Sequence, residues 1–140
     1  MRFMLIVKAT KDSEAGVLPT QEELAEMGKF NEELVKAGVM LAGEGLQASS
    51  KGARVFFSGD QRKVVDGPFT ETKELVAGFW LVQVKSKDEA IEWVKRVPFR
   101  DGIVEIRQVF EAEDFGPALT PELRQAEERL RAKTSRLGSR

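Results

Sequence analysis

The chain has 140 residues, 22 basic against 23 acidic side chains, and 41% hydrophobic residues, which suits a single domain with its own core. It contains no His, Cys or Tyr, so Ser-His-Asp and Cys-His nucleophiles, thiolate zinc sites and disulfides are excluded. A formal charge of −1 predicts neither a nucleic-acid nor a membrane partner. The first apolar run, Phe3–Val7, is too short for a membrane span or a signal peptide, which predicts a cytoplasmic protein.

The first half of the chain reads as a strand, a helix and a second strand. Phe3–Val7 is continuously apolar, as expected of a strand covered on both faces. A polar loop follows, and Thr20 with Glu23 then forms a capping box that predicts the start of a helix. Gly38 is placed to end that helix, and a second strand is predicted over Val39–Leu46.

The same order returns in the second half. Phe79–Val84 reads as a strand, Ser86 with Glu89 as a second capping box, and Ile103–Phe110 as the last strand. Two β-α-β halves predict an α+β fold, a ferredoxin-like βαββαβ sandwich. A doubly wound α/β fold is the rival, and two helices with a hairpin do not suit it.

Two further segments complete the predicted fold. Arg54–Phe57 and Lys63–Val65 flank a Ser-Gly-Asp-Gln turn, which predicts an inserted hairpin. An acidic connector follows Phe110, and Thr120 is the predicted N-cap of a C-terminal helix with a narrow apolar stripe. We expect residues 1–110 to form the ferredoxin-like domain and residues 111–140 to belong to the same domain.

One face of the predicted sheet has no helix to cover it. Alternation in the last strand places Val104 and Ile106 on the helix side, and Glu105 and Arg107 on the open side. The first strand is apolar on both faces, so the open face needs a cover. We expect a second copy of the chain to provide it, giving a homodimer. The alternative is that the C-terminal helix covers it within one chain.

Charged residues on that face are candidates for function. Glu44 lies between Gly43 and Gly45, where the backbone can approach another group closely, and it is the better site candidate. For Glu105 and Arg107 an ion pair that fixes the register of the dimer is the favoured interpretation.

The segment from Asp66 to Glu74 is the most specific motif in the chain. Asp66, Gly67 and Pro68 form a turn that ends a strand, and Phe69 is an apolar anchor. Residues 70–74 can make one helical turn. On local grounds this is a tight turn fixed by one aromatic side chain. Because the segment also contains several acidic residues and a lysine, it is a candidate for the rim of a functional site.

These residues resemble the DGPF subgroup of the YCII-related (YciI-like) family. The resemblance runs from Phe3 to about Phe110 and rests on the Asp66–Phe69 motif with Glu71, Lys73, Glu74 and Gly78, and on Ala37–Val39, Gly43–Leu46, Asp88–Trp93 and Glu105–Arg107. It implies a ferredoxin-like fold that pairs into a dimeric α+β barrel. Most of the family has no known function. One relative is a dehydrochlorinase acting on a chlorinated hydroxyquinol-type ring. A His-Asp pair is proposed as the family's active site. Some DGPF proteins are associated with extracytoplasmic-function sigma factors.

The chain departs from that pattern at the proposed catalytic pair. It has no His, and Gln47 stands where members of the subgroup often have one. Gln forms hydrogen bonds but does not titrate near neutral pH. A His-Asp mechanism is therefore excluded.

Two functions remain. The first is binding of an unidentified small molecule in a dimer-associated cleft, with regulation as one use of it. The alternative is a cofactor-independent, dehydrochlorinase-like lyase with a lone carboxylate as proton carrier. We predict no metal and no cofactor. The candidate catalytic residues are Asp66 and Glu44, expected in one cleft at the edge of the sheet, and the candidate ligand-binding residues are Gly67, Pro68, Phe69, Glu71, Lys73 and Arg107.

Overall fold

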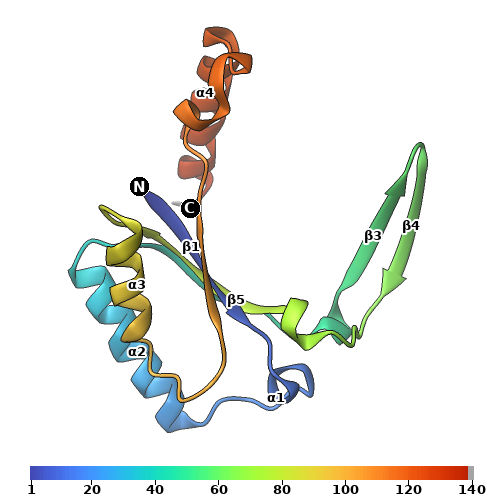
Figure 1. Cartoon of the computed structure of the whole chain (residues 1–140), viewed down its shortest axis with the longest axis vertical. Coiled ribbons are helices and arrows are strands. Elements are labelled where there is room, and N and C mark those ends of the chain that lie inside the picture. The colour runs from blue at the N-terminus through green and yellow to red at the C-terminus, as the bar shows by residue number, and fades with distance from the viewer. Residues whose placement is uncertain (139–140) are drawn as a thin grey trace. The chain divides into compact units, whose positions relative to one another are not determined.

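The computed structural model describes residues 1–138 and divides the chain after Val109 into two compact units. The first unit contains six strands, three α-helices and two short 3₁₀ helices (Figure 1). In chain order they are β1 (Arg2–Lys8), α1 (Lys11–Glu14), α2 (Gln21–Lys36), β2 (Met40–Gly45), η1 (Ser49–Lys51), β3 (Ala53–Ser58), β4 (Gln61–Asp66), η2 (Thr72–Glu74), β5 (Val76–Gln83), α3 (Lys87–Lys95) and β6 (Val104–Gln108).

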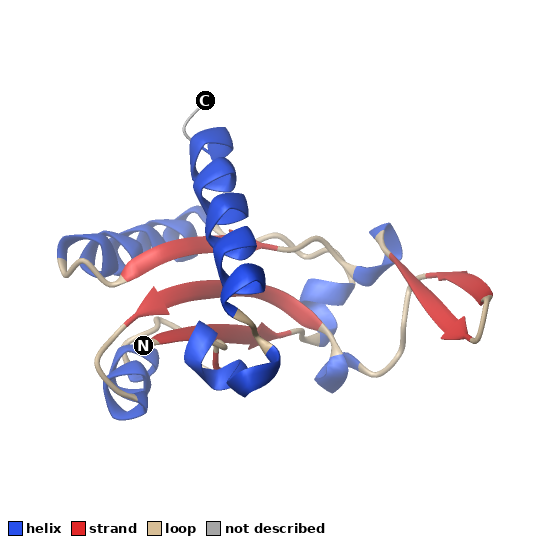
Figure 2. Ribbon diagram, turned by 90° about the horizontal axis from the view of Figure 1, so that it is seen from above, coloured by secondary structure: helices blue, strands red, loops and turns tan. Residues whose placement is uncertain are grey.

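Four of the strands form one antiparallel sheet in the order β2-β5-β1-β6. Helices α2 and α3 lie together on one face of it (Figure 1). The other two strands, β3 and β4, pair with each other and form the predicted hairpin (Figure 2). The α+β class and the two β-α-β halves predicted from the sequence are confirmed.

The core lies between this sheet and the two helices. Phe3 and Leu5 of β1 are 1% and 0% exposed, and they pack with Leu34 of α2 and Val82 of β5. Val104 and Ile106 of β6 pack against the same cluster, as the alternation predicts.

The helix starts follow from local sequence. The Thr20 hydroxyl accepts from the Glu23 N–H at 3.1 Å, and the Glu23 carboxylate accepts from the Thr20 N–H at 3.2 Å, so the first capping box is confirmed. Ser86 caps α3 by accepting from the Glu89 N–H at 3.1 Å. The prediction of a second capping box is wrong in one respect. The Glu89 carboxylate accepts from the Lys85 N–H at 2.7 Å, and not from the N–H of the cap residue Ser86.

Several element bounds differ from the prediction, and one short helix was not predicted. The polar loop after β1 contains α1, which is too short to show an apolar period and is started by a capping box of Thr10 with Ser13. β5 begins at Val76 rather than Phe79, because Val76 and Gly78 pair with Lys8 and Val7 of β1. β6 ends at Gln108 rather than Phe110, because it is an edge strand whose pairing with β1 ends there.

The second unit consists of η3 (Ala112–Ala118) and α4 (Pro121–Gly138). The predicted acidic connector therefore contains 3₁₀ turns with a kink at Gly116. The rings of Phe110 and Phe115 stack with centroids 4.9 Å apart. The Thr120 hydroxyl accepts from the Leu123 N–H at 3.3 Å, which confirms the predicted N-cap. Within residues 1–138, no helix combines the length and apolar character that crossing a membrane requires.

The sheet face opposite α2 and α3 has an apolar centre. Residues directly opposite each other in an antiparallel pair share a face. Met4 lies opposite Leu81, and Ile6 lies opposite Phe79, and all four are half-buried. We call these four residues the open-face cluster. Glu44 borders it from β2, opposite Phe79.

A small ion-pair network borders the cluster on the β6 side. Glu105 lies opposite Ile6, and its carboxylate is 3.8 Å from the Lys8 ammonium and 3.3 Å from the Arg107 guanidinium. Glu105 and Arg107 thus form an ion pair within one chain, and its role in fixing the register of a dimer stays a prediction.

Candidate functional site

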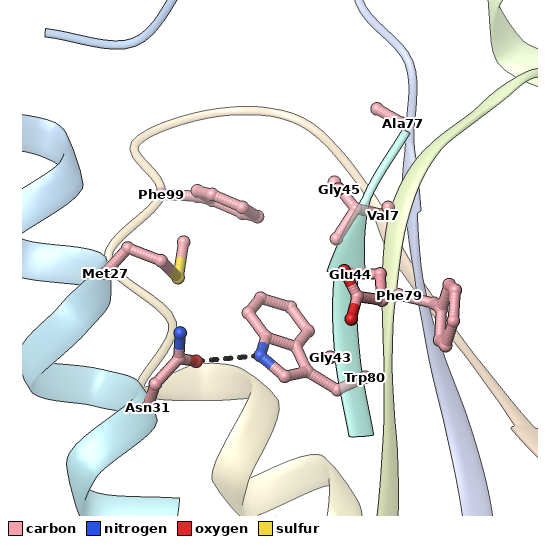
Figure 3. Close-up of a pocket in the computed structure, with 11 residues that line it drawn as sticks. Val7, Met27, Asn31, Gly43, Glu44, Gly45, Ala77, Phe79, Trp80 and Phe99 are labelled. Carbon is pink, nitrogen blue, oxygen red and sulfur yellow. Dashed lines mark hydrogen bonds between the residues drawn. The ribbon is translucent and has the colours of Figure 1, made fainter. Parts of the chain in front are cut away.

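A pocket of about 240 Å³ lies between helix α2, the edge strand β2 and the neighbouring strand β5. Phe99, from the loop after α3, forms a further part of its wall (Figure 3). The lining is mainly apolar, with two polar side chains: Val7, Met27, Asn31, Gly43, Glu44, Gly45, Ala77, Gly78, Phe79, Trp80 and Phe99.

Trp80 is the largest side chain of this pocket and is held rigidly. It is 6% exposed, and its ring makes edge contacts with Phe30 at a centroid distance of 5.6 Å. Its indole N–H donates to the Asn31 side-chain oxygen at 2.9 Å (Figure 3). A buried indole N–H needs such a partner, so Asn31 fixes the orientation of the ring.

The glycines of β2 explain how the indole fits beside an edge strand. Gly43 lies opposite Trp80, and a Cβ atom there would be 2.9 Å from Trp80 Cδ1 and 2.6 Å from Met40 Cε. Gly43 is therefore required for close packing, as the sequence predicts. A Cβ atom on Gly45 would meet nothing within 4 Å, so packing does not explain that glycine.

Glu44 is the ionisable residue of the lining. It is exposed, and its carboxylate lies on the strand side of the pocket, across from Met27 and Asn31 on helix α2 (Figure 3). Because Glu44 is directly opposite Phe79, it belongs both to the pocket and to the border of the open-face cluster. A cover over that cluster would therefore also reach one side of the pocket.

The sequence predicts a site at Glu44, and the structure places Glu44 in the lining of this pocket, but the sequence alone does not identify the side chains around it. Met27, Phe30, Asn31 and Leu34 recur at the spacing of one helix face. The signal available in the sequence was a polar residue, Asn31, in the apolar stripe of this helix. Such a residue needs a hydrogen-bond partner in the core. The partner, Trp80, is far away in the sequence and could be identified only from the fold.

The predicted turn lies at the base of the hairpin and has a structural role. Asp66 ends β4 opposite Ala53, and the Gly67 N–H donates to the Gly52 carbonyl at 3.0 Å. The Gly67–Pro68 peptide bond is cis. A Cβ atom on Gly67 would collide with the carbonyl oxygen of Ser49. The turn is thus in close contact with the segment that precedes β3.

Ser49 connects this turn to α1. Its hydroxyl accepts from the Phe69 N–H at 2.9 Å, and its own N–H donates to the Glu14 carboxylate at 2.8 Å. The Ser49 hydroxyl also donates to Glu14. The Phe69 ring lies under the Arg54 guanidinium at 3.9 Å. These contacts fix the hairpin base, so we refer to Glu14, Ser49, Gly67 and Phe69 as the hairpin clamp.

The predicted site residues occupy three places in one chain. The first place is the hairpin base and the segment just after it, which contains Asp66, Gly67, Pro68, Phe69, Glu71 and Lys73. None of these six residues lines the Glu44 pocket. Arg107 is on β6 and Glu44 on β2, which are opposite edges of the sheet. At the usual spacing of strands, the two edges are about 14 Å apart. A cleft shared by Asp66 and Glu44 stays a prediction.

Replacing Ser49 tests the clamp. We expect Ser49→Ala to lower the free energy of unfolding by about 1–2 kcal/mol, because the half-buried Phe69 N–H and the Glu14 carboxylate each lose a hydrogen bond. Ser50→Ala, at an exposed neighbour, is the control and should change it by less than about 0.5 kcal/mol. Equal urea midpoints for the two variants would show that the clamp contributes nothing.

The chain is similar to a curated protein, to a solved structure and to a family model. The chain is 31% identical over 72 residues to an uncharacterized protein of Rhizobium meliloti (strain 1021), a stretch that covers 51% of this chain and 58% of that one. The chain thus spans little more than half of that relative's length. A solved structure, 5-chloro-2-hydroxyhydroquinone dehydrochlorinase (TftG) from Burkholderia phenoliruptrix AC1100 with 2,5-dihydroxybenzoquinone, matches 81% of this chain and 98% of its own, at 18% identity and a TM-score of 0.38. The model of the YCII-related domain matches residues 1–113, most of the chain, which therefore belongs to the YCII-related family.

Proposed function

We propose that the protein binds a small molecule in the Glu44 pocket. The observation that carries this proposal is the Trp80 indole, fixed by Asn31, at the wall of a largely apolar cavity whose lining also includes Glu44. Small-molecule sites are typically apolar concavities with a few placed polar groups. A volume of about 240 Å³ suits a ligand the size of one substituted ring.

We further propose that the protein is a homodimer whose copies meet through the open-face cluster. Four half-buried apolar side chains on the sheet face opposite α2 and α3 support this, because such a face is stabilised by a cover. Since Glu44 and Phe79 border both the cluster and the pocket, pairing through this face would place the pocket beside the dimer interface. Membership of the DGPF subgroup and a cytoplasmic location stay predictions from the sequence.

A lyase mechanism is not favoured. The proton carrier of such an enzyme would need an enclosed carboxylate. Glu44, Asp66 and Glu71 are all exposed in the chain. Asp66 and Glu71 also lie outside the pocket.

The binding proposal can be tested with the indole N–H groups as reporters. Trp80 and Trp93 are the only two Trp residues, so a ¹⁵N spectrum contains two indole signals, and Trp93→Phe assigns them. In a screen of single-ring fragments at millimolar concentration, we expect the Trp80 signal to shift with saturation and the Trp93 signal to stay in place. Trp93 is the internal control, because it does not line the pocket.

Two results would count against binding at this pocket. One is a library in which no fragment shifts the Trp80 signal. The other is a set of fragments that shift both indole signals equally, as a general change in packing would.

A further inference from the structure

The charges around the Glu44 pocket restrict what it can bind. Of its eleven lining residues, Glu44 is the only one with an ionisable side chain, and none is Lys or Arg. We propose that the ligand is an organic cation, an ammonium group carried on a compact apolar or aromatic body. This inference rests on the proposed function and adds the chemical class of the ligand.

The neutral polar groups do not favour an anion either. The Trp80 indole N–H already donates to Asn31, so it is engaged within the protein. The side-chain amide of Asn31 is then the remaining donor among the lining side chains. One neutral donor beside a carboxylate is a poor site for an anion, because the carboxylate repels it.

The aromatic rings add a second preference for a cation. The rings of Trp80 and Phe99 are 6.5 Å apart between centroids and tilted by 42°, and both line the pocket. An ammonium group near aromatic rings is attracted by their π electrons, and a carboxylate nearby adds a charge-charge attraction. The attraction to the rings and the attraction to the carboxylate both favour a cation at this pocket.

A neighbouring groove offers room for the apolar part of such a ligand. It has a volume of about 470 Å³ and shares Val7, Met27, Ala77 and Phe99 with the pocket. Its charged residues are three acids and one base: Asp12, Glu23, Asp101 and Lys8. The base lies 3.8 Å from Glu105, so it already has an acidic partner. The groove thus extends the preference for positive charge.

Three probes of nearly equal shape separate the ligand classes: benzylammonium, benzyl alcohol and benzoate. We expect benzylammonium to shift the Trp80 indole signal with a dissociation constant about tenfold below that of benzyl alcohol, from the carboxylate and aromatic contributions together. Benzoate should bind more weakly than the alcohol. Glu44→Gln should bring benzylammonium to within about threefold of the alcohol. Glu32→Gln, the same change on the exposed surface of α2, should leave the tenfold preference intact.

The outcomes separate the two proposals. If benzyl alcohol or benzoate saturates the Trp80 shift at least as readily as benzylammonium, the cation proposal is overturned while binding at the pocket stands. A preference for benzylammonium that survives Glu44→Gln also overturns it. If none of the probes shifts the Trp80 signal, the cation proposal fails, and the fragment screen decides separately on binding of any small molecule.

Discussion

Gly67→Ala is expected to lower the free energy of unfolding by about 2–3 kcal/mol, the cost of forcing extra volume into a well-packed place. The new Cβ atom would collide with the carbonyl oxygen of Ser49, which is backbone and cannot rotate away as a side chain can. Relief requires the hairpin base to separate from the segment before it, which weakens the bonds from Gly67 to Gly52 and from Phe69 to Ser49. Urea unfolding monitored by circular dichroism gives the measurement.

Gly28→Ala is the matched control for this substitution. Gly28 lies inside α2, and a Cβ atom there would meet nothing within 4 Å. Alanine is the better helix former, so this variant should gain about 0.5–1 kcal/mol of stability. If Gly67→Ala were as stable as the wild-type protein, the close contact with Ser49 would not exist in solution.

The second large effect concerns assembly. Leu81 belongs to the open-face cluster and lies between Met4 of β1 and Ala42 of β2. Leu81→Glu would place one carboxylate from each copy in the proposed interface, away from water and without a partner. We expect the dissociation constant of the dimer to rise by about 100-fold or more, which is about 2.7 kcal/mol. Light scattering at micromolar concentration would then report a dimer for the wild-type protein and a monomer for the variant.

Val35→Glu controls for the added charge. Val35 is 63% exposed on helix α2, away from the sheet, so its replacement should leave the dimer intact. Circular dichroism shows whether Leu81→Glu is folded, and the milder Leu81→Ser provides a second variant if it is not. A wild-type protein that scatters as a monomer would contradict the proposed dimer. A Leu81→Glu variant that remains a dimer would place the interface elsewhere, and substitutions of Leu123 and Leu130 in α4 would then be the next test.

Much of this fold could be predicted because its signals are local. The Thr20 capping box, the apolar run of β1 and the turn between β3 and β4 each depend on a few neighbouring residues. Element ends that depend on pairing were less predictable. β5 starts early because Val76 has a partner in Lys8 of β1, and nothing in the local sequence reports that partner.

The site was less predictable than the fold for the same reason. The position of Glu44 between two glycines is visible in the sequence, and this made it a candidate. The bond between Asn31 and Trp80 joins residues 49 positions apart, so it appears only once α2 lies on the sheet. The composition of the Asp66–Phe69 motif predicts a site rim as well as a tight turn, whereas its contacts with Ser49 show a role in holding the hairpin.

The most direct test of the ligand site is a crystal structure of the protein with a fragment that shifts the Trp80 indole signal, benzylammonium being the first choice. We expect electron density for the fragment between Trp80, Phe99 and Glu44, with its ammonium group toward the Glu44 carboxylate. Density at the Asp66–Lys73 segment, with the Glu44 pocket containing only water, would contradict the assignment of the pocket.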